Sequence, residues 1–119
     1  MSESVLREKA KEFAKNIVFI TREIKSNNKE SVLTNQLVRS GTSVGANIRE
    51  AFYGHGTADF VAKLKVALKE ASETQYWLRL LCETEYISNQ AFQSLHNDLV
   101  EILKILTAIC KHYPQNNQL

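Results

Sequence analysis

The chain has 119 residues, of which 15 are Lys or Arg and 13 are Asp or Glu, so its formal net charge is +2 with neutral histidines. This length fits one domain that can bury a core without metals or disulfides, and the small charge excess does not by itself indicate a nucleic-acid partner. No apolar run reaches the ~18 residues of a membrane span and no signal-peptide pattern is present, so we expect a cytoplasmic protein with no membrane partner.

The first expected helix combines an apolar face with most of the excess positive charge. Its apolar residues recur at alternating steps of four and three, the spacing of a buried helical stripe: Leu6, Ala10, Phe13, Ile17, Ile20 and Ile24. Residues 1–29 hold seven Lys or Arg against four acids, whereas the remainder of the chain holds eight against nine. The turn-forming run Ser26-Asn27-Asn28 ends this helix.

The second expected helix runs from about Glu30 to Tyr53 and has two different stripes. Its apolar anchors are Leu33, Leu37, Val44, Ile48 and Phe52, and its second stripe is small and polar, with Ser40, Ser43, Asn47, Glu50 and Gly54 at steps of three and four. A solvated face normally carries long charged side chains, so this polar stripe indicates a seam against another helix. Because a buried polar group without a partner costs about 1–3 kcal/mol, we expect the seam to find partners in the chain or in a neighbouring copy.

Two further helices follow the glycines around His55. Thr57 is the expected N-cap of the third helix, whose inward stripe is Phe60, Leu64, Ala67, Ala71, Thr74, Leu78 and Leu81. After a break near Ser88, the fourth helix repeats the pattern with Phe92, Leu95, Leu99, Ile102, Leu106, Ile109 and Tyr113.

Short connections between long helices force neighbouring helices to run antiparallel. The sequence therefore predicts an all-α protein, an antiparallel up-down-up-down four-helix bundle with left-handed packing. We expect a single bundle domain over residues 1–113 and a frayed, Asn/Gln-rich tail over residues 114–119.

The sequence lacks the motifs of enzyme and metal chemistry. A di-iron site in a bundle needs Glu-x-x-His on two helices, and none of the three histidines follows a Glu at that spacing. Cys82 and Cys110 have neither CxxC nor Cys/His spacing, so we expect them to be small buried hydrophobes. With no nucleophile elbow and no phosphate-binding glycine loop, we expect a protein that is not an enzyme and has no catalytic residue, metal or cofactor.

Two blocks of sequence carry a resemblance to a known family. They are Leu33-x-x-Gln36-Leu37-x-Arg39-Ser40-x-x-Ser43-x-x-Ala46-Asn47-Ile48-x-Glu50-Ala51 and Asp59-Phe60-x-x-Lys63-Leu64-x-x-Ala67-x-Lys69-Glu70-Ala71-x-Glu73-Thr74-x-Tyr76-Trp77-Leu78. Together they resemble the small bacterial four-helix-bundle protein family, also called the intervening-sequence or "ribosomal protein" family because some members are encoded in insertions in large-subunit (23S) rRNA genes. The usual Asn-Ile-Ala-Glu-Gly of that family reads Asn47-Ile48-Arg49-Glu50-Ala51 here.

The resemblance implies a bundle that assembles into a ring-like homo-oligomer, described as a pentamer, without an established enzymatic activity. A related branch serves as accessory protein to the reverse transcriptases of diversity-generating retroelements, where a basic ring contacts nucleic acid. For this chain the resemblance therefore implies self-association, with RNA or the ribosome as a further partner.

The residues of the expected polar seam admit two interpretations. They are Arg39, Ser40, Ser43, Asn47, Arg49 and Glu50 of the second helix and Glu70, Glu73 and Tyr76 of the third. They could bind a ligand or an ion, or they could form a structural network in which the acidic edge of the third helix pairs with Arg39 or Arg49. We favour the network, because a two-pronged Arg–carboxylate contact fixes helix register well.

The candidate nucleic-acid contacts lie on the first helix. They are Lys9, Lys11, Lys15, Arg22 and Lys25, and the last four share one face at helical spacing, although Glu8 and Glu12 lie near that face. One hypothesis is an RNA- or ribosome-associated oligomer that uses this face. The alternative is a structural scaffold or protein–protein interaction module that does not bind nucleic acid.

Overall fold

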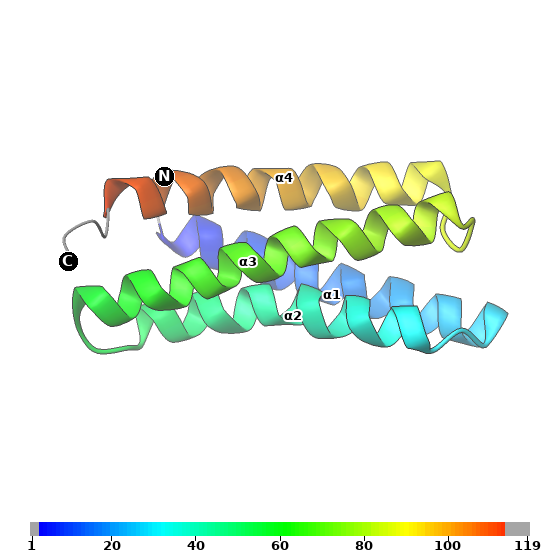
Figure 1. The fold of residues 1–119 in the computed structure, drawn as a ribbon, viewed down its shortest axis with the longest axis horizontal. Coiled ribbons are helices and arrows are strands. Elements are labelled where there is room, and N and C mark those ends of the chain that lie inside the picture. The colour runs from blue at the N-terminus through cyan, green and yellow to red at the C-terminus, as the bar shows by residue number, and fades with distance from the viewer. Residues whose placement is uncertain (1–2, 114–119) are drawn as a thin grey trace.

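The computed structural model describes residues 3–113, with side chains described from Val5 onward. The described chain forms four helices: α1 (Glu3–Asn28), α2 (Val32–Phe52), α3 (Gly56–Glu83) and α4 (Asn89–His112). The predicted all-α four-helix bundle is confirmed (Figure 1). The expected frayed tail at residues 114–119 lies outside the described residues.

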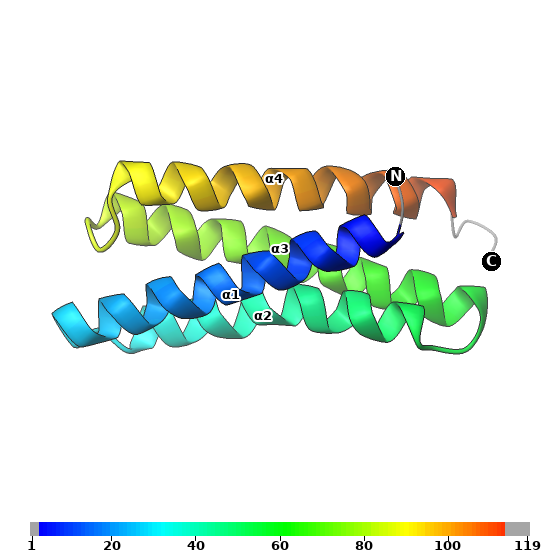
Figure 2. The same cartoon turned by 180° about the vertical axis from the view of Figure 1, so that it is seen from behind.

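The helices lie lengthwise against one another in a molecule of 47 × 25 × 22 Å. The colour gradient, which follows the chain from blue to red, runs in opposite directions along consecutive helices. Consecutive helices are therefore antiparallel (Figures 1 and 2). Helices α1 and α3 each pack against both α2 and α4, which places α1 diagonally opposite α3. Each helix therefore has two flanks that face neighbours, and the two flanks of α2 face α1 and α3.

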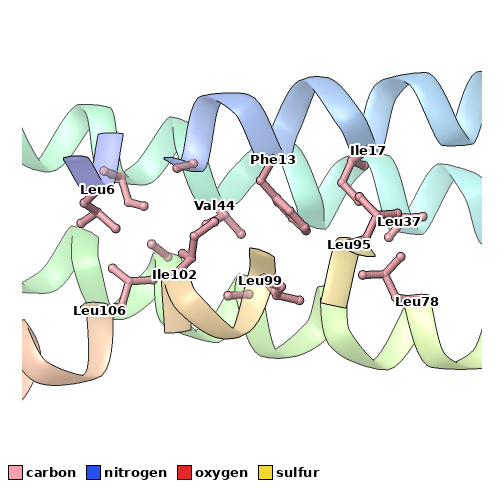
Figure 3. Close-up of a cluster of buried hydrophobic side chains, with 14 of the residues drawn as sticks. Leu6, Phe13, Ile17, Leu37, Val44, Leu78, Leu95, Leu99, Ile102 and Leu106 are labelled. Carbon is pink, nitrogen blue, oxygen red and sulfur yellow. The ribbon is translucent and has the colours of Figure 1, made fainter. Parts of the chain in front are cut away.

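The core lies along the bundle axis and is built from the predicted apolar stripes. Side chains from all four helices point toward one another there, among them Leu6 and Phe13 of α1, Val44 of α2, Leu78 of α3 and Leu99 of α4 (Figure 3). All five are at most 1% exposed. At about 25 cal/mol per Å² of apolar surface removed from water, this burial is the main term that holds the bundle together.

The stripes are less completely buried toward the helix ends. Phe60 and Phe92, near the starts of α3 and α4, are only half-buried, and Tyr113 is 37% exposed at the end of α4. Fewer neighbouring helices surround a side chain near the end of a bundle, so a position on the correct stripe does not by itself ensure full burial.

Capping groups set the beginnings of α2 and α4. The backbone amides of Leu33 and Thr34 donate to the Glu30 carboxylate at 2.8 and 3.0 Å, which satisfies amides that have no partner inside the helix. Burial acts to raise the pKa of Glu30, but the hydrogen bonds from Leu33, Thr34 and Val32 outweigh it and lower the pKa below its ordinary value. At α4 the Ser88 hydroxyl accepts a hydrogen bond from the amide of Ala91 at 3.0 Å.

The start of α3 differs from the sequence prediction. Helix α3 begins at Gly56 with His55 in the N-cap position, so Thr57 is not the cap that was expected. Gly56 has a φ of 82°, a left-handed backbone conformation that glycine adopts without a steric penalty. The glycine allows the helix to begin two residues earlier than it would with a side-chain cap at Thr57.

Candidate functional site

The flank of α2 that faces α3 contains an ion-pair network centred on Arg39. One end of the Arg39 guanidinium bonds Glu70 Oε1 at 3.2 Å and the other bonds Glu73 Oε2. The Arg39 side chain is 48% exposed, whereas those of Glu70 and Glu73 are 15% and 33% exposed. The two carboxylates are thus partly withdrawn from water, and Arg39 is the cation that compensates both of them.

Beneath this network, the fully buried Ser40 and Thr74 join α2 to α3 through their hydroxyl groups. The two oxygens lie 3.0 Å apart. Each also has a backbone carbonyl of its own helix within reach, Leu37 O at 3.4 Å for Ser40 and Glu70 O at 2.7 Å for Thr74. Both buried hydroxyl groups therefore have partners, as burial requires.

The aromatic member of the network is Trp77 rather than Tyr76. The Trp77 indole Nε1 donates to Glu73 Oε2 at 3.2 Å, while Tyr76 is 61% exposed and contacts the Trp77 ring edge-on at 5.0 Å between centroids. Consecutive helical residues point about 100° apart, so only one of the pair can face the seam. The sequence identified the pair but assigned the seam position to the wrong ring.

The remaining residues of the expected seam are divided between three environments. Asn47 donates to the backbone carbonyl and to the hydroxyl of Ser43, at 2.9 and 3.0 Å, so these two bond within α2. Glu50 makes an exposed ion pair with Lys63 of α3 at 3.1 Å. Arg49 lies on the opposite flank of α2, where its guanidinium covers the Tyr53 ring at 5.1 Å. The sequence left open whether Arg39 or Arg49 meets the acidic edge, and the structure places Arg39 there.

This α2–α3 seam is a paired network of the kind that fixes helix register. Within residues 3–113, no group of three or more His, Cys, Asp or Glu side chains is arranged to hold a metal ion. Cys82 and Cys110 are both half-buried and free, and burial raises the pKa of the Cys110 thiol, which keeps it in the unreactive protonated form.

The structure separates the five candidate nucleic-acid contacts of α1 by their partners. Lys9 faces α4 and pairs with Glu101 at 3.0 Å, and Lys15 pairs with Glu12 one turn away at 3.3 Å. Lys25 donates to the neutral Asn35 side chain at 2.6 Å. The other two, Lys11 and Arg22, make no ion pair with any residue in the described part of the chain, and Arg22 lies over the Phe19 ring at 5.8 Å.

The flank of α2 that faces α1 holds a groove that the sequence did not predict. It has a volume of about 460 Å³, and the cations Arg7, Lys11 and Arg49 line it together with Glu8 and Tyr53. We call it the basic groove. The small residues Ala14, Thr42, Gly45 and Ala46 line it between the two helices.

Glycines on this flank allow α1 and α2 to approach closely. A β-carbon on Gly41 would lie 2.9 Å from Cγ2 of the fully buried Ile17, which is closer than real contacts allow. A β-carbon on Gly45 would lie 3.4 Å from the Ala10 carbonyl oxygen, which is ordinary contact. Gly41 is therefore required by packing, whereas Gly45 leaves room beside the groove.

Two residues of the basic groove were missed at the sequence level, although a signal existed for each. Arg7 precedes Lys11 by one helical turn and so belongs to the same stripe of α1. Asn47 and Arg49 border the apolar stripe of α2 on opposite sides, because residues two positions apart in a helix point about 200° apart. Helical periodicity alone could therefore have placed Arg49 away from the seam. It could not have shown that Arg49 lines the same groove as Arg7 of α1.

Fold and seam together define a compact four-helix bundle in which Arg39 and Ser40 of α2 bond to residues of α3. A family model described as "23S rRNA-intervening sequence protein" matches residues 2–108, and the chain belongs to that family. No curated protein matches the chain. Among solved structures, it is similar to a protein with unknown function from the S23 ribosomal protein family of Bacteroides thetaiotaomicron VPI-5482. That structure has a TM-score of 0.91 and 49% identity, over 93% of this chain and 99% of the other.

These matches bear on the remaining sequence predictions. The resemblance to the intervening-sequence family is confirmed over nearly the whole chain. Neither matching description names a catalytic activity. None of the described helices has both the length and the apolar character needed to cross a membrane.

Proposed function

We propose that this chain is a non-enzymatic, homo-oligomeric helical bundle that associates with RNA or the ribosome through the basic face of α1. The observation that carries the RNA part is uncompensated charge: Lys11 and Arg22 have no carboxylate partner among the described residues, and Lys25 bonds only a neutral amide there. A cation already paired with a carboxylate has less to gain from a phosphate, so Lys9 and Lys15 are secondary contacts in this proposal.

The names of the matching proteins support a connection with RNA. The family is described by its occurrence as a 23S rRNA-intervening sequence protein, and the similar Bacteroides structure is assigned to a ribosomal protein family. Association with RNA would also fit the family resemblance, in which a related branch uses a basic ring.

Self-association is supported by large apolar side chains that remain in contact with water. Phe19, Val32 and Tyr76 are 55%, 71% and 61% exposed. In the proposed oligomer, a neighbouring copy covers these side chains. A pentamer, as the family resemblance implies, would multiply a charge of +2 per chain to about +10 and make RNA binding steeply dependent on salt.

A matched pair of charge reversals tests the RNA proposal. We expect the triple variant Lys11→Glu, Arg22→Glu, Lys25→Glu to lose RNA retention in a filter-binding assay. The control Lys69→Glu, Lys104→Glu, Lys111→Glu changes the net charge by the same amount on exposed residues of α3 and α4 and should retain most of it. Circular dichroism would verify that both variants fold. Unchanged retention in the α1 variant would contradict the proposal, and equal loss in both variants would reduce it to an effect of net charge.

Native mass spectrometry of the protein purified from its own cells at low salt tests the assembly. We expect a homo-oligomer that carries RNase-sensitive mass. An oligomer free of nucleic acid would favour the alternative function, a structural scaffold or protein–protein interaction module. A monomer would contradict the oligomer proposal.

A further inference from the structure

The basic groove differs from the rest of the surface in how its cations are held. The Arg7 guanidinium lies 5.1 Å from the centroid of the Phe52 ring, and that of Arg49 lies 5.1 Å from the centroid of Tyr53. A planar guanidinium packed on an aromatic face loses little further freedom when it binds a ligand. The groove therefore presents two pre-positioned arginines, one from each helix, together with Lys11.

These cations lack compensation within the described part of the protein. None of Arg7, Lys11 and Arg49 forms an ion pair with another described residue, and the buried Nε of Arg7 has no hydrogen-bond partner there. Glu8 is the one acid among the lining residues, which leaves an excess of two positive charges from three cations and one carboxylate. Arg39 shows the contrasting case, because this chain supplies it with two carboxylates.

The size and chemistry of the groove favour a phosphate group. Its volume of about 460 Å³ is within the ordinary range for ligand sites, and the small side chains between the helices leave space close to the backbone. Two arginines that line one groove from different helices match an anion with several oxygens, which phosphate offers in three dimensions and a carboxylate only in one plane. Arg22 and Lys25 continue the stripe of Arg7 and Lys11 to about 27 Å from Arg7, at 1.5 Å rise per residue. A chain of phosphates could follow this line.

We propose that the basic groove formed by Arg7, Lys11 and Arg49 is a phosphate-binding site that holds a phosphate of an RNA strand lying along α1. This inference rests on the proposed function for its RNA source, whereas the phosphate chemistry of the groove stands apart from it. A free phosphorylated small molecule offers the same chemistry, so the two sources need separate measurements.

The main experiment compares two double variants with the same change in charge. Arg7→Gln, Arg49→Gln removes the arginines of the groove, and Arg22→Gln, Lys25→Gln removes two cations farther along α1. For a single-stranded RNA oligonucleotide we expect at least about a tenfold loss of affinity in the groove variant and a smaller loss in the distal variant. Because the groove holds one phosphate, the slope of log K against log salt should fall by about 0.7 in the groove variant. Equal losses would overturn the groove while leaving RNA association intact.

A second arm uses inorganic pyrophosphate and isothermal titration calorimetry. If wild type binds no RNA, the proposed function fails, but one pyrophosphate per chain that is lost in the groove variant would still support the phosphate site. Absence of both ligands would overturn the site as well. If RNA binding depends on the groove and pyrophosphate does not bind, the RNA strand is the ligand source.

Arg7 also packs on Phe52, so the loss of Arg7 could weaken binding by disturbing the fold. A variant that is expected to gain affinity separates the two effects, because misfolding would not tighten binding. Glu8→Gln removes the one carboxylate among the lining residues and touches neither arginine stack. We expect tighter RNA binding, by about threefold to tenfold, and the exposed Glu83→Gln, at the end of α3, serves as the control. Weaker or unchanged binding in Glu8→Gln would overturn the assignment of this groove.

Discussion

The two flanks of α2 each carry an arginine, and the two arginines differ in whether carboxylates pair with them. Toward α3, Arg39 is joined to Glu70 and Glu73 above a buried pair of hydroxyl groups. Toward α1, Arg49 lies over an aromatic ring beside a groove, with no carboxylate partner among the described residues. Removing a partner is costly where a charge is partly buried and paired, and nearly free where the charge remains in water. We therefore interpret the flank that faces α3 as a structural contact and the flank that faces α1 as a surface available to a ligand.

The largest expected effect comes from the same substitution made on both flanks. Arg39→Ala should lower the free energy of unfolding by about 2 kcal/mol, because it leaves two partly buried carboxylates without their cation. Arg49→Ala should change it by less than about 0.5 kcal/mol, because its side chain is exposed and unpaired in the described structure. Urea unfolding measures both. Equal stability losses would remove the distinction between the flanks.

A smaller effect is expected from the two glycines that face α1. Gly41→Ala should lower the free energy of unfolding by about 1 kcal/mol, because the overlap with Ile17 outweighs the gain in helix propensity. Gly45→Ala should raise it by about 0.5–1 kcal/mol, because its β-carbon fits and the unfolded chain loses freedom. Thermal unfolding of the two variants measures the difference. Stabilisation by both would show that close approach at Gly41 is not required.

The smallest expected effect tests the start of α2, which both flanks share. Glu30 has a lowered pKa in the folded protein, so its contribution to stability is present above the ordinary carboxyl pKa and is lost as pH falls through the folded value. Glu30→Gln should therefore cost about 0.5–1 kcal/mol at pH 7, and the difference from wild type should shrink below about pH 4. Urea unfolding at several pH values measures it. A difference independent of pH would mean that the carboxylate charge does not support the helix start.

The sequence predicted the fold more completely than the site. Leu6 and Phe13 of α1 recur at helical spacing, as do Leu95 and Leu99 of α4, and this spacing indicates which face of each helix avoids water. The position of Thr57 as a cap was wrong, because the backbone freedom of Gly56 decided the start of α3. Tyr76 was placed in the seam instead of Trp77, because neighbouring aromatic residues differ only by the rotation of one residue about the helix axis.

The sequence by itself determined the four helices, their apolar faces and the existence of a small polar stripe on α2, because helical periodicity is a local property of the chain. Only the tertiary structure decided which charges are paired. Arg39 and Arg49 are the same residue type on the same helix. They differ because Glu70 and Glu73 of α3 pair with Arg39, whereas Arg49 lines a groove together with Arg7 of α1. Residues 31 to 42 positions apart come together only through packing, and the energy of a charge depends on the neighbours that packing supplies.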